Sequence, residues 1–543
     1  MAEQHSEAKK HLLERRLRGE LGLRPSTQAI PPRKPGQTIP LSYAQEQVWL
    51  HAQLAGDFPL YNEPVTIHYS GALNVAALEQ SFNEILRRHE AWRTVFSVVD
   101  GQATQKVVPN LSISLPVLDL RNIPQAERNA AALTIATEDA RRPIDLGRVP
   151  LFWARLIRVD NEEYRLYLTL SHIIFDGVGF YRVFLPELAT LYKAYEAGKP
   201  SPLPEPVIQY PDFACWQRQT MTTEALAKDV EFWSKQLSRN LPDSYLPVDR
   251  TQKTALTFRG SMYPFRLSQS LTSKLGAFCR TEDVSLFHVL FAAFAALLYR
   301  YSGEEVIPIG SITAGRDRPE TEALLGYFLN TVVFPSDVSG NPSFRTLVQR
   351  FRDLTIDVLE HDRLPFEHLV KELKVRRNPG RNPLFQAMFS LDPPLPEIDP
   401  AWRLTQMDVD TGASKYDLYL ELGERSAEVL ARFHYSTDLF NSAMIAAMAN
   451  HWQRLLEGAI DSPEQALSQL PVLTPDENNQ IVTEWNRTDC SYPQACIHEL
   501  FELQVDRSPD AVAVVFEDSQ LSYRELNERA NQLAWYLRQQ GVG

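Results

Sequence analysis

One short segment carries the residue types for acid–base chemistry. It runs from Ser171 to Gly177 and reads SHIIFDG. The histidine, His172, can accept or release a proton near neutral pH because its unperturbed pKa is about 6.5. Asp176, directly before a glycine, is suited to holding a loop or pairing with an arginine. The pattern permits a histidine that handles a proton and an aspartate that holds the loop, but so short a pattern often occurs by chance.

The elements around this segment place it where clefts form. Residues 164–171 (YRLYLTLS) alternate between polar and apolar side chains, which predicts a strand. Residues 180–197 have a helical pattern that ends at Gly198, a common helix stop. His172 is therefore expected at the end of a strand, in a loop that leads into a helix.

Composition narrows the class of protein. The chain has 543 residues, 55 Lys and Arg against 68 Asp and Glu, and a net charge of −13, which disfavours a broad nucleic-acid surface. Its longest apolar run, residues 289–299, is too short for a bilayer, which needs about 20 residues. Four cysteines without a C-x-x-C pair favour a reducing compartment, so we expect a cytoplasmic protein without a membrane. The histidines lack metal-ligand spacing, and no metal site is expected.

Proline-rich and polar stretches suggest five segments. Residues 1–40 are expected to be a charged helix and a linker, and residues 456–496 a second linker. Between them we expect an N-terminal lobe over 41–210 and a C-terminal lobe over 211–455. Residues 497–543 start a new unit that is too short for a domain of ordinary size, so we expect the chain to be cut from a longer one.

The SHIIFDG segment is similar to the HHxxxDG signature of the condensation domains of nonribosomal peptide synthetases. Six further motifs of that family occur in the family's order between residues 41 and 390, which together are very specific. The first of them has Gln47 and Val48 in place of Arg-Leu. The six are Ser42–Leu50 (SYAQEQVWL), Arg88–Phe96 (RHEAWRTVF), Tyr210–Trp216 (YPDFACW), Gly326–Thr331 (GYFLNT), His361–Val370 (HDRLPFEHLV) and Arg381–Phe389 (RNPLFQAMF).

The resemblance implies an α/β (α+β) fold of two lobes like chloramphenicol acetyltransferase, arranged as a V with the active-site tunnel between them. It implies that donor and acceptor carrier proteins each deliver a phosphopantetheine thioester, and that the acceptor amine attacks the donor thioester to form an amide. No cofactor is then bound by the chain itself. Residues 521–526 (LSYREL) resemble the first motif of an adenylation domain, which makes the chain's own adenylation domain a further partner.

The resemblance also assigns residues. His172 matches the catalytic histidine, either as a general base or as a group that orients the amine. Asp176 matches a structural aspartate whose partner is Arg316. Gly177 would let the backbone approach the pantetheine arm, and Asn330 and Thr331 are expected near the tunnel.

Ser171 departs from the signature, which has histidine at this position. A neutral substitution, a hybrid domain with a polyketide-derived donor, and a dehydrating domain that acts on a seryl or threonyl donor all remain open. The segment Pro59–Ile67 (PLYNEPVTI) resembles the hybrid type. A catalytically silent docking scaffold is the non-enzymatic alternative. His172 disfavours a heterocyclisation domain, and the LSYREL tail disfavours an epimerisation domain.

Overall fold

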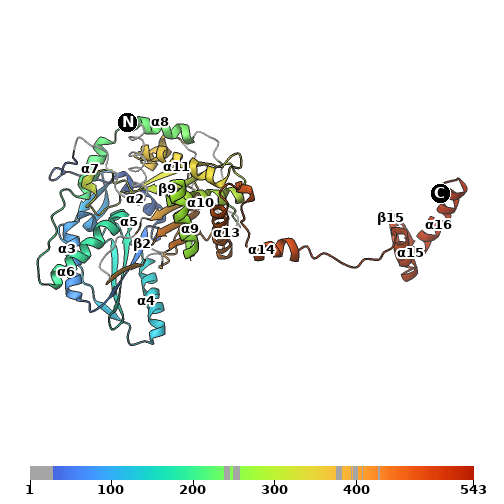
Figure 1. The fold of residues 1–543 in the computed structure, drawn as a ribbon, viewed down its shortest axis with the longest axis horizontal. Helices are drawn as coiled ribbons and strands as arrows, with labels where there is room; N and C mark the ends of the chain where they lie inside the picture. Colours follow the sequence, from blue (N-terminus) through green and yellow to red (C-terminus); the bar gives the residue numbers. More distant parts are fainter. Residues whose placement is uncertain are drawn as a thin grey trace. The chain divides into compact units, whose positions relative to one another are not determined.

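The computed structural model describes residues 29–237, 242, 245–248, 257–374, 382–392, 394, 401–405, 408–425 and 428–543. The charged helix expected near the N-terminus falls within residues 1–28, which lie outside the described residues. The chain forms two compact units, one that ends at Thr474 and one from Pro475 to Gly543 (Figure 1). The larger unit consists of two lobes, each built on a β-sheet.

The N-terminal lobe is built on a five-stranded sheet with the order β12-β2-β7-β6-β5, beside a small sheet with the order β1-β4-β3. The strands are β1 (Ile39–Pro40), β2 (Asn62–Ser70), β3 (Thr94–Val99), β4 (Gln102–Val107), β5 (Val117–Asp119), β6 (Phe152–Asp160), β7 (Glu163–Ser171) and β12 (Trp402–Thr405). The helices are α2 (Tyr43–Ala55), α3 (Val75–Arg88), η1 (Glu90–Arg93), α4 (Gln125–Ala140), η2 (His172–Ile174), α5 (Gly177–Gly179), η3 (Phe180–Phe184), α6 (Leu185–Glu196) and α7 (Tyr210–Thr220).

Alternation along β7 gives the sheet two buried faces. Leu166, Leu168 and Leu170 pack in the main core of the lobe with residues of α3 and α6. Tyr167 points to the other face, where it packs with residues of α4. Figure 1 shows α3 and α6 on one side of these strands and α4 on the other. The strand expected over 164–171 is confirmed and begins one residue earlier.

The C-terminal lobe is built on a six-stranded sheet with the order β10-β9-β11-β13-β14-β8. Its strands are β8 (Gly260–Arg266), β9 (Val306–Thr313), β10 (Asn330–Asp337), β11 (Ala387–Asp392), β13 (Leu418–Glu424) and β14 (Val429–Ser436). The helices are α8 (Thr223–Leu237), α9 (Gln269–Glu282), α10 (Leu286–Ser302), η4 (Pro319–Thr321), α11 (Phe344–Glu360), α12 (Phe366–Glu372), α13 (Ser442–Asp461) and η5 (Leu467–Gln469).

Only one face of this second sheet packs on the central helix α10. Leu418, Leu420 and Leu422 of β13 are fully buried in the core that α10 shares. The intervening residues Tyr419 and Glu421 pair across the sheet with His434 and Arg432 of β14. Strand alternation therefore directs a row of polar side chains away from the core and toward the other lobe.

The lobe boundary expected between residues 210 and 211 falls inside a helix. These residues form the first turn of α7, and Tyr210, Phe213 and Trp216 pack in the N-terminal core. The chain enters the C-terminal core only with α8, where Trp233 is buried. It later returns, because β12 pairs antiparallel with β2 of the N-terminal sheet.

The expected linkers are also partly folded. Ile30 is buried in the N-terminal core, and Arg33 forms ion pairs with Glu90 and Asp212. After residue 456, α13 continues to Asp461 and Leu467 is fully buried in the C-terminal core. The smaller unit contains α14 (Pro475–Asn479), η6 (Gln480–Glu484), α15 (Ile497–Arg507), β15 (Val512–Phe516), β16 (Ser519–Ser522) and α16 (Tyr523–Gln539).

Among the described residues, no single helix is both long and apolar enough to cross a membrane. The helices α9 and α10 pass that test only as a pair, with a bend of 108° between them. Within the same residues, no group of three or more His, Cys, Asp or Glu side chains is arranged to hold a metal ion.

Candidate active site

The loop that carries His172 is held by backbone and side-chain hydrogen bonds. Strand β7 ends at Ser171, and the His172 N–H then donates to the Tyr61 carbonyl at 2.9 Å. The Gln45 amide donates to the carbonyl of Ile173 at 3.3 Å. Gln45 belongs to the motif over residues 42–50, so that motif supports the loop from α2.

The hydrogen bonds of His172 determine which ring nitrogen is available. Its Nδ1 lies 3.0 Å from the Phe175 carbonyl oxygen, which can only accept, so Nδ1 donates and Nε2 has the free lone pair. The side chain is 14% exposed, and its ring lies 4.8 Å from that of Tyr327. Burial first, and then the charge of Lys415, lower the pKa of His172 below its ordinary value. The ring is therefore neutral at pH 7 and can accept a proton at Nε2.

Asp176 and Arg316 form a buried ion pair between the two lobes. The Arg316 Nη2 donates to both Asp176 oxygens, at 3.1 and 3.2 Å, and both side chains are at most 1% exposed. Asp176 also accepts from the N–H groups of Gly179 at 2.6 Å and Phe328 at 2.9 Å. The residue before Arg316, Gly315, has φ +61°, and a Cβ there would lie 1.9 Å from the Phe328 oxygen.

Two glycines follow in this loop, and they have different surroundings. A Cβ on Gly179 would lie 2.7 Å from the Arg316 Nη2 atom, so the ion pair requires glycine at this position. A Cβ on Gly177 would come within 3.4 Å of Tyr181, and both of these residues line the main cavity. The sequence interpretation singled out Gly177 and missed Gly179.

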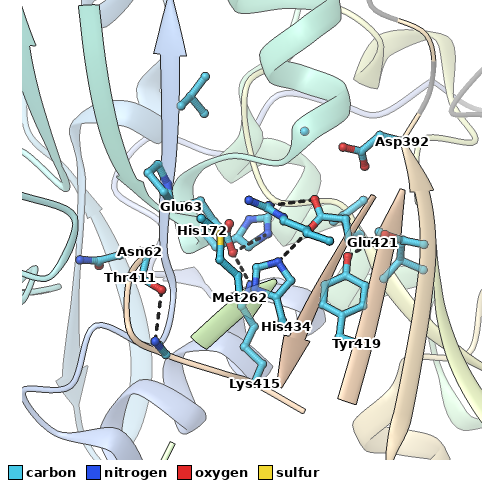
Figure 2. A pocket seen from close by; sticks show the side chains of 18 of the residues that line it. Asn62, Glu63, His172, Met262, Asp392, Thr411, Lys415, Tyr419, Glu421 and His434 are labelled. Atoms are coloured by element: carbon cyan, nitrogen blue, oxygen red, sulfur yellow. Dashed lines mark hydrogen bonds and ion pairs between the residues drawn. The ribbon is translucent and has the colours of Figure 1, made fainter. Parts of the chain in front are cut away.

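The main cavity lies between the lobes, with His172 and the polar face of the second sheet on its walls. Figure 2 shows Glu63 next to His172, and Glu421, His434 and Tyr419 across from them. The N-terminal lobe contributes Leu60, Asn62, Glu63, Pro64, Val65, His172, Phe175, Gly177, Val178 and Tyr181. The other lobe contributes Met262, Phe287, Ser311, Thr313, Leu329, Ser390, Asp392, Lys415, Tyr419, Glu421, Arg432 and His434, among others.

The wall of the cavity opposite His172 contains the carboxylate of Glu421, whose charge is balanced by Arg432. The Arg432 guanidinium donates to both oxygens of Glu421, at 2.8 and 3.0 Å, and the His434 Nε2 lies 2.9 Å from Glu421 Oε2. Burial would raise the pKa of Glu421, but Arg432 and His434 outweigh it and hold the pKa well below its usual range. Burial and the nearby Glu421 charge raise the pKa of Asp392. The wall is thus polar, with its strongest charge neutralised.

A second ion pair lies directly beside His172, and the sequence interpretation missed it. Lys415 of the C-terminal lobe donates to Glu63 Oε1, and the same oxygen lies 3.7 Å from His172 Nε2. Burial raises the pKa of Glu63, but the charge of Lys415 and its hydrogen bond act against burial, the pKa is lowered, and the carboxylate stays ionised. The only sequence signal was the polar pair Asn62–Glu63 inside the apolar segment over residues 59–67.

The remaining expected site residues, Asn330, Thr331 and Ser171, do not line the cavity beside His172. The Asn330 side chain donates to the carbonyls of Asp362 and Leu364, at 2.8 and 2.9 Å, and lines a second cavity. Thr331 is buried, bonds with Tyr416 and lines neither of these two cavities. Ser171 is 3% exposed and is likewise outside both linings.

The second cavity adjoins the first. Ala314 and Leu329 line both of them, and Arg316 lines the second beside Phe328 and Trp216. The Asp176–Arg316 pair thus lies where the loop of His172 meets the segment that separates the cavities. The two cavities therefore share the part of their walls that Ala314 and Leu329 form.

Comparison with known proteins identifies the class. The Condensation domain family matches residues 36–482, and the AMP-binding enzyme family matches residues 501–543. The chain therefore belongs to the Condensation domain family, a family of amide-forming acyltransferases in nonribosomal peptide synthetases, and its residues 501–543 match part of an AMP-binding enzyme.

Curated relatives and solved structures agree with this assignment. One of the linear gramicidin synthase proteins of Brevibacillus parabrevis is 40% identical over 509 residues, which are 93% of this chain and 10% of that protein. A holo four-domain nonribosomal peptide synthetase, bound to AMP and glycine, superposes with a TM-score of 0.79 at 21% identity, covering 93% of this chain and 39% of that one. The X-domain from teicoplanin biosynthesis, solved in complex with OxyB, has a TM-score of 0.72 at 23% identity and covers 83% of this chain and 100% of that one. The expected two-lobed fold is confirmed.

Proposed function

We propose that this chain joins two carrier-bound groups by forming an amide bond in the cavity beside His172. The donor is a thioester on one carrier protein, and the acceptor is an aminoacyl thioester on another, each attached through phosphopantetheine. The observation that carries this proposal is the neutral His172, whose free Nε2 faces a cavity between the lobes. The chain spans 6% to 10% of three linear gramicidin synthase proteins, so these partners are part of the proposal.

The cavity suits a pantetheine arm. Gly177 places bare backbone on the wall, and a Cβ there would narrow the space toward Tyr181. The arm supplies an activated thioester, and the residues of this chain hold it in place and handle protons. Positioning two reacting groups in this way can contribute about 7–11 kcal/mol to the barrier reduction.

His172 would act on the acceptor amine. As the amine nitrogen attacks the donor carbonyl carbon, its proton passes to Nε2, and the C–S bond then breaks. The proton goes to the departing sulfur, which leaves a free thiol on the donor arm and an amide on the acceptor. A positioned base of this kind typically contributes about 10²–10⁴-fold. The Phe175 carbonyl keeps the ring in the tautomer that this step requires.

The structural position of Ser171 favours plain condensation over a dehydrating reaction. Its side chain lines neither cavity, so a substrate in the cavity beside His172 would not touch it. A hybrid domain with a polyketide-derived donor fits the same site, since the chemistry at the amine is unchanged. A recruiting scaffold is the second candidate, because the X-domain, which shares this fold, was solved in complex with OxyB.

The proposed compartment is the cytoplasm. All four cysteines, Cys215, Cys279, Cys490 and Cys496, are free thiols. Free thiols persist most readily in a reducing environment, where disulfides are rare. The carrier proteins would therefore be loaded in the same compartment.

Intact-protein mass spectrometry tests the function. Donor and acceptor carriers loaded with a panel of acyl and aminoacyl groups are mixed with this chain or with H172A. We expect the donor mass to move onto the acceptor with the native chain and to move about 10²–10⁴-fold more slowly with H172A. Transfer with loss of one water would instead identify a dehydrating domain. Absence of transfer across the panel in both chains would support the scaffold.

A further inference from the structure

We propose that Glu63 and His172 together form a binding site for the acceptor's α-ammonium group, so that the chain takes its acceptor in the protonated form. This inference rests on the proposed amide-forming function and adds a residue that touches the acceptor. Its basis is the juxtaposition of Glu63 Oε1 and His172 Nε2, 3.7 Å apart on the wall of the main cavity.

The two facing atoms are both hydrogen-bond acceptors. Nδ1 of His172 donates to the Phe175 carbonyl, so Nε2 of the neutral ring has only a lone pair to offer. The ionised carboxylate of Glu63 also has only lone pairs. Neither atom can satisfy the other, and a group with two or more N–H donors would satisfy both. An α-ammonium group has three.

Lys415 does not remove this demand. Its ammonium donates to Glu63 Oε1, and its nitrogen lies 5.1 Å from the centre of the Tyr61 ring, where the ring holds it. A carboxylate has about four lone-pair positions, so one lysine leaves Glu63 able to accept from a second donor. Lys415 balances the negative charge of Glu63. The amide nitrogen of the product is uncharged, so the site no longer holds it as an ion pair and can release the product.

The charge near His172 comes from several elements. Glu63 of β2 and Asp176 of its own loop favour a positive ring, Lys415 and burial oppose it, and Tyr327 contacts the ring edge. Glu421 lies on the far wall, where Arg432 and His434 neutralise it. Glu63 is therefore the carboxylate placed to stabilise a proton that moves between an amine and Nε2.

The proton balance follows from this geometry. The bound ammonium gives one proton to Nε2, and the imidazolium formed is paired with Glu63 while the freed amine attacks the donor carbonyl carbon. The C–S bond breaks, and the imidazolium proton goes to the departing sulfur. The second proton lost by the nitrogen goes to solvent as the amide forms. The products are an amide, a thiol and one released proton.

The pH dependence of turnover provides the first test. An α-ammonium has a reference pKa of about 8, so native kcat/KM for the acceptor carrier is expected to hold down to the pKa of His172 and to fall above pH 8. E63Q must use the neutral amine. Its kcat/KM is expected to rise with pH, with a midpoint near pH 8 and a plateau above about pH 9, and to be roughly 30-fold below that plateau at pH 6.5.

The control is E163Q, which removes a carboxylate of β7 that is paired with Arg165 and is outside the cavity lining. E163Q is expected to keep the native profile. Native and E63Q chains with the same profile shape would overturn the proposal while leaving amide formation intact.

A binding measurement covers the case in which no tested donor reacts. Glycyl-aminopantetheine, in which a stable amide replaces the acceptor thioester, and its N-acetyl form are titrated into the native chain and E63Q at pH 7 by calorimetry. We expect the ammonium form to bind at least tenfold more tightly than the N-acetyl form to the native chain, and this preference to be lost in E63Q. Equal binding of the two probes to the native chain would overturn the proposal whether or not transfer is ever observed.

Discussion

The Arg316 guanidinium lies 3.1 Å from one oxygen of Asp176 and 3.2 Å from the other, and neither side chain is more than 1% exposed. Arg316 also donates to the carbonyls of Thr321 and Leu324, at 2.5 and 2.9 Å. The pair thereby connects the loop of His172 to the segment between β9 and β10. It positions the site and takes no part in proton transfer.

The variant R316M should be strongly destabilised, because it leaves the Asp176 carboxylate buried without its cation. We expect a loss of about 3–5 kcal/mol in the free energy of unfolding, measured by urea titration. The control is R266M, since Arg266 pairs with Glu428 at the surface and is 68% exposed. That change should cost no more than about 1 kcal/mol. Similar losses in the two variants would contradict the buried-pair account.

Gly179 should tolerate substitution less well than Gly177. An alanine Cβ at Gly179 would lie 2.7 Å from Arg316 Nη2 and 3.2 Å from Asp176 Oδ1, and both groups are already fixed by each other. We expect G179A to lose about 1–3 kcal/mol of stability. At Gly177 the nearest atom is Tyr181 Cε2 at 3.4 Å, so G177A should unfold at a higher urea concentration than G179A. A lower urea midpoint for G177A than for G179A would show that the contact with Arg316 does not determine which glycine tolerates substitution.

Ser171 should be dispensable for transfer. Its side chain is buried and lines neither cavity, so S171A is expected to keep the native rate of amide formation in the mass assay. A variant that folds, as judged by an unchanged urea midpoint, yet loses transfer would favour the dehydrating reaction over plain condensation.

Removing the charge of Lys415 should raise the pKa of His172. The lysine charge disfavours the imidazolium, and burial disfavours it more, so the native pKa lies below the ordinary 6.5. In K415M burial is the one of these two influences that still lowers the pKa of His172. The Glu63 carboxylate has also lost its lysine partner and can stabilise the imidazolium. NMR titration of the ring carbon protons should show the His172 midpoint moving to higher pH.

K274M provides the matched comparison, because Lys274 pairs with Asp461 at the surface and is 49% exposed. Its His172 midpoint should equal that of the native chain. A midpoint in K415M that stays the same or falls would exclude Lys415 as an influence on the ring.

Local patterns in the sequence predicted the strand and loop that carry His172. Alternation over residues 164–171 identifies a strand whose last residue is Ser171, and the histidine must then begin the loop. The expected partnership of Asp176 with Arg316 came from family resemblance, and the structure places the two in contact. No local pattern links residues so far apart in the chain.

Local sequence patterns could not predict the contact between Glu63 and Lys415 either, because the two residues are far apart in the chain. Glu63 is in β2 of the N-terminal lobe. Lys415 comes 352 residues later in the chain, after β12, the strand that pairs with β2. The only local signal was the polar pair Asn62–Glu63 inside an apolar segment, and it does not point to Lys415. Asn330 was expected near the tunnel from its place in a motif. Its amide donates to the carbonyls of Asp362 and Leu364, and the residue lines the second cavity.

The pairing of β12 with β2 has a consequence for how the chain is made and engineered. During synthesis the N-terminal sheet is left with a bare edge along β2 until residues 402–405 have emerged, long after the rest of that lobe. A bare edge of this kind invites pairing with other chains. Fragments that end between the lobes should therefore aggregate. When parts are exchanged between synthetases, residues 29–474 should be transferred together as one unit.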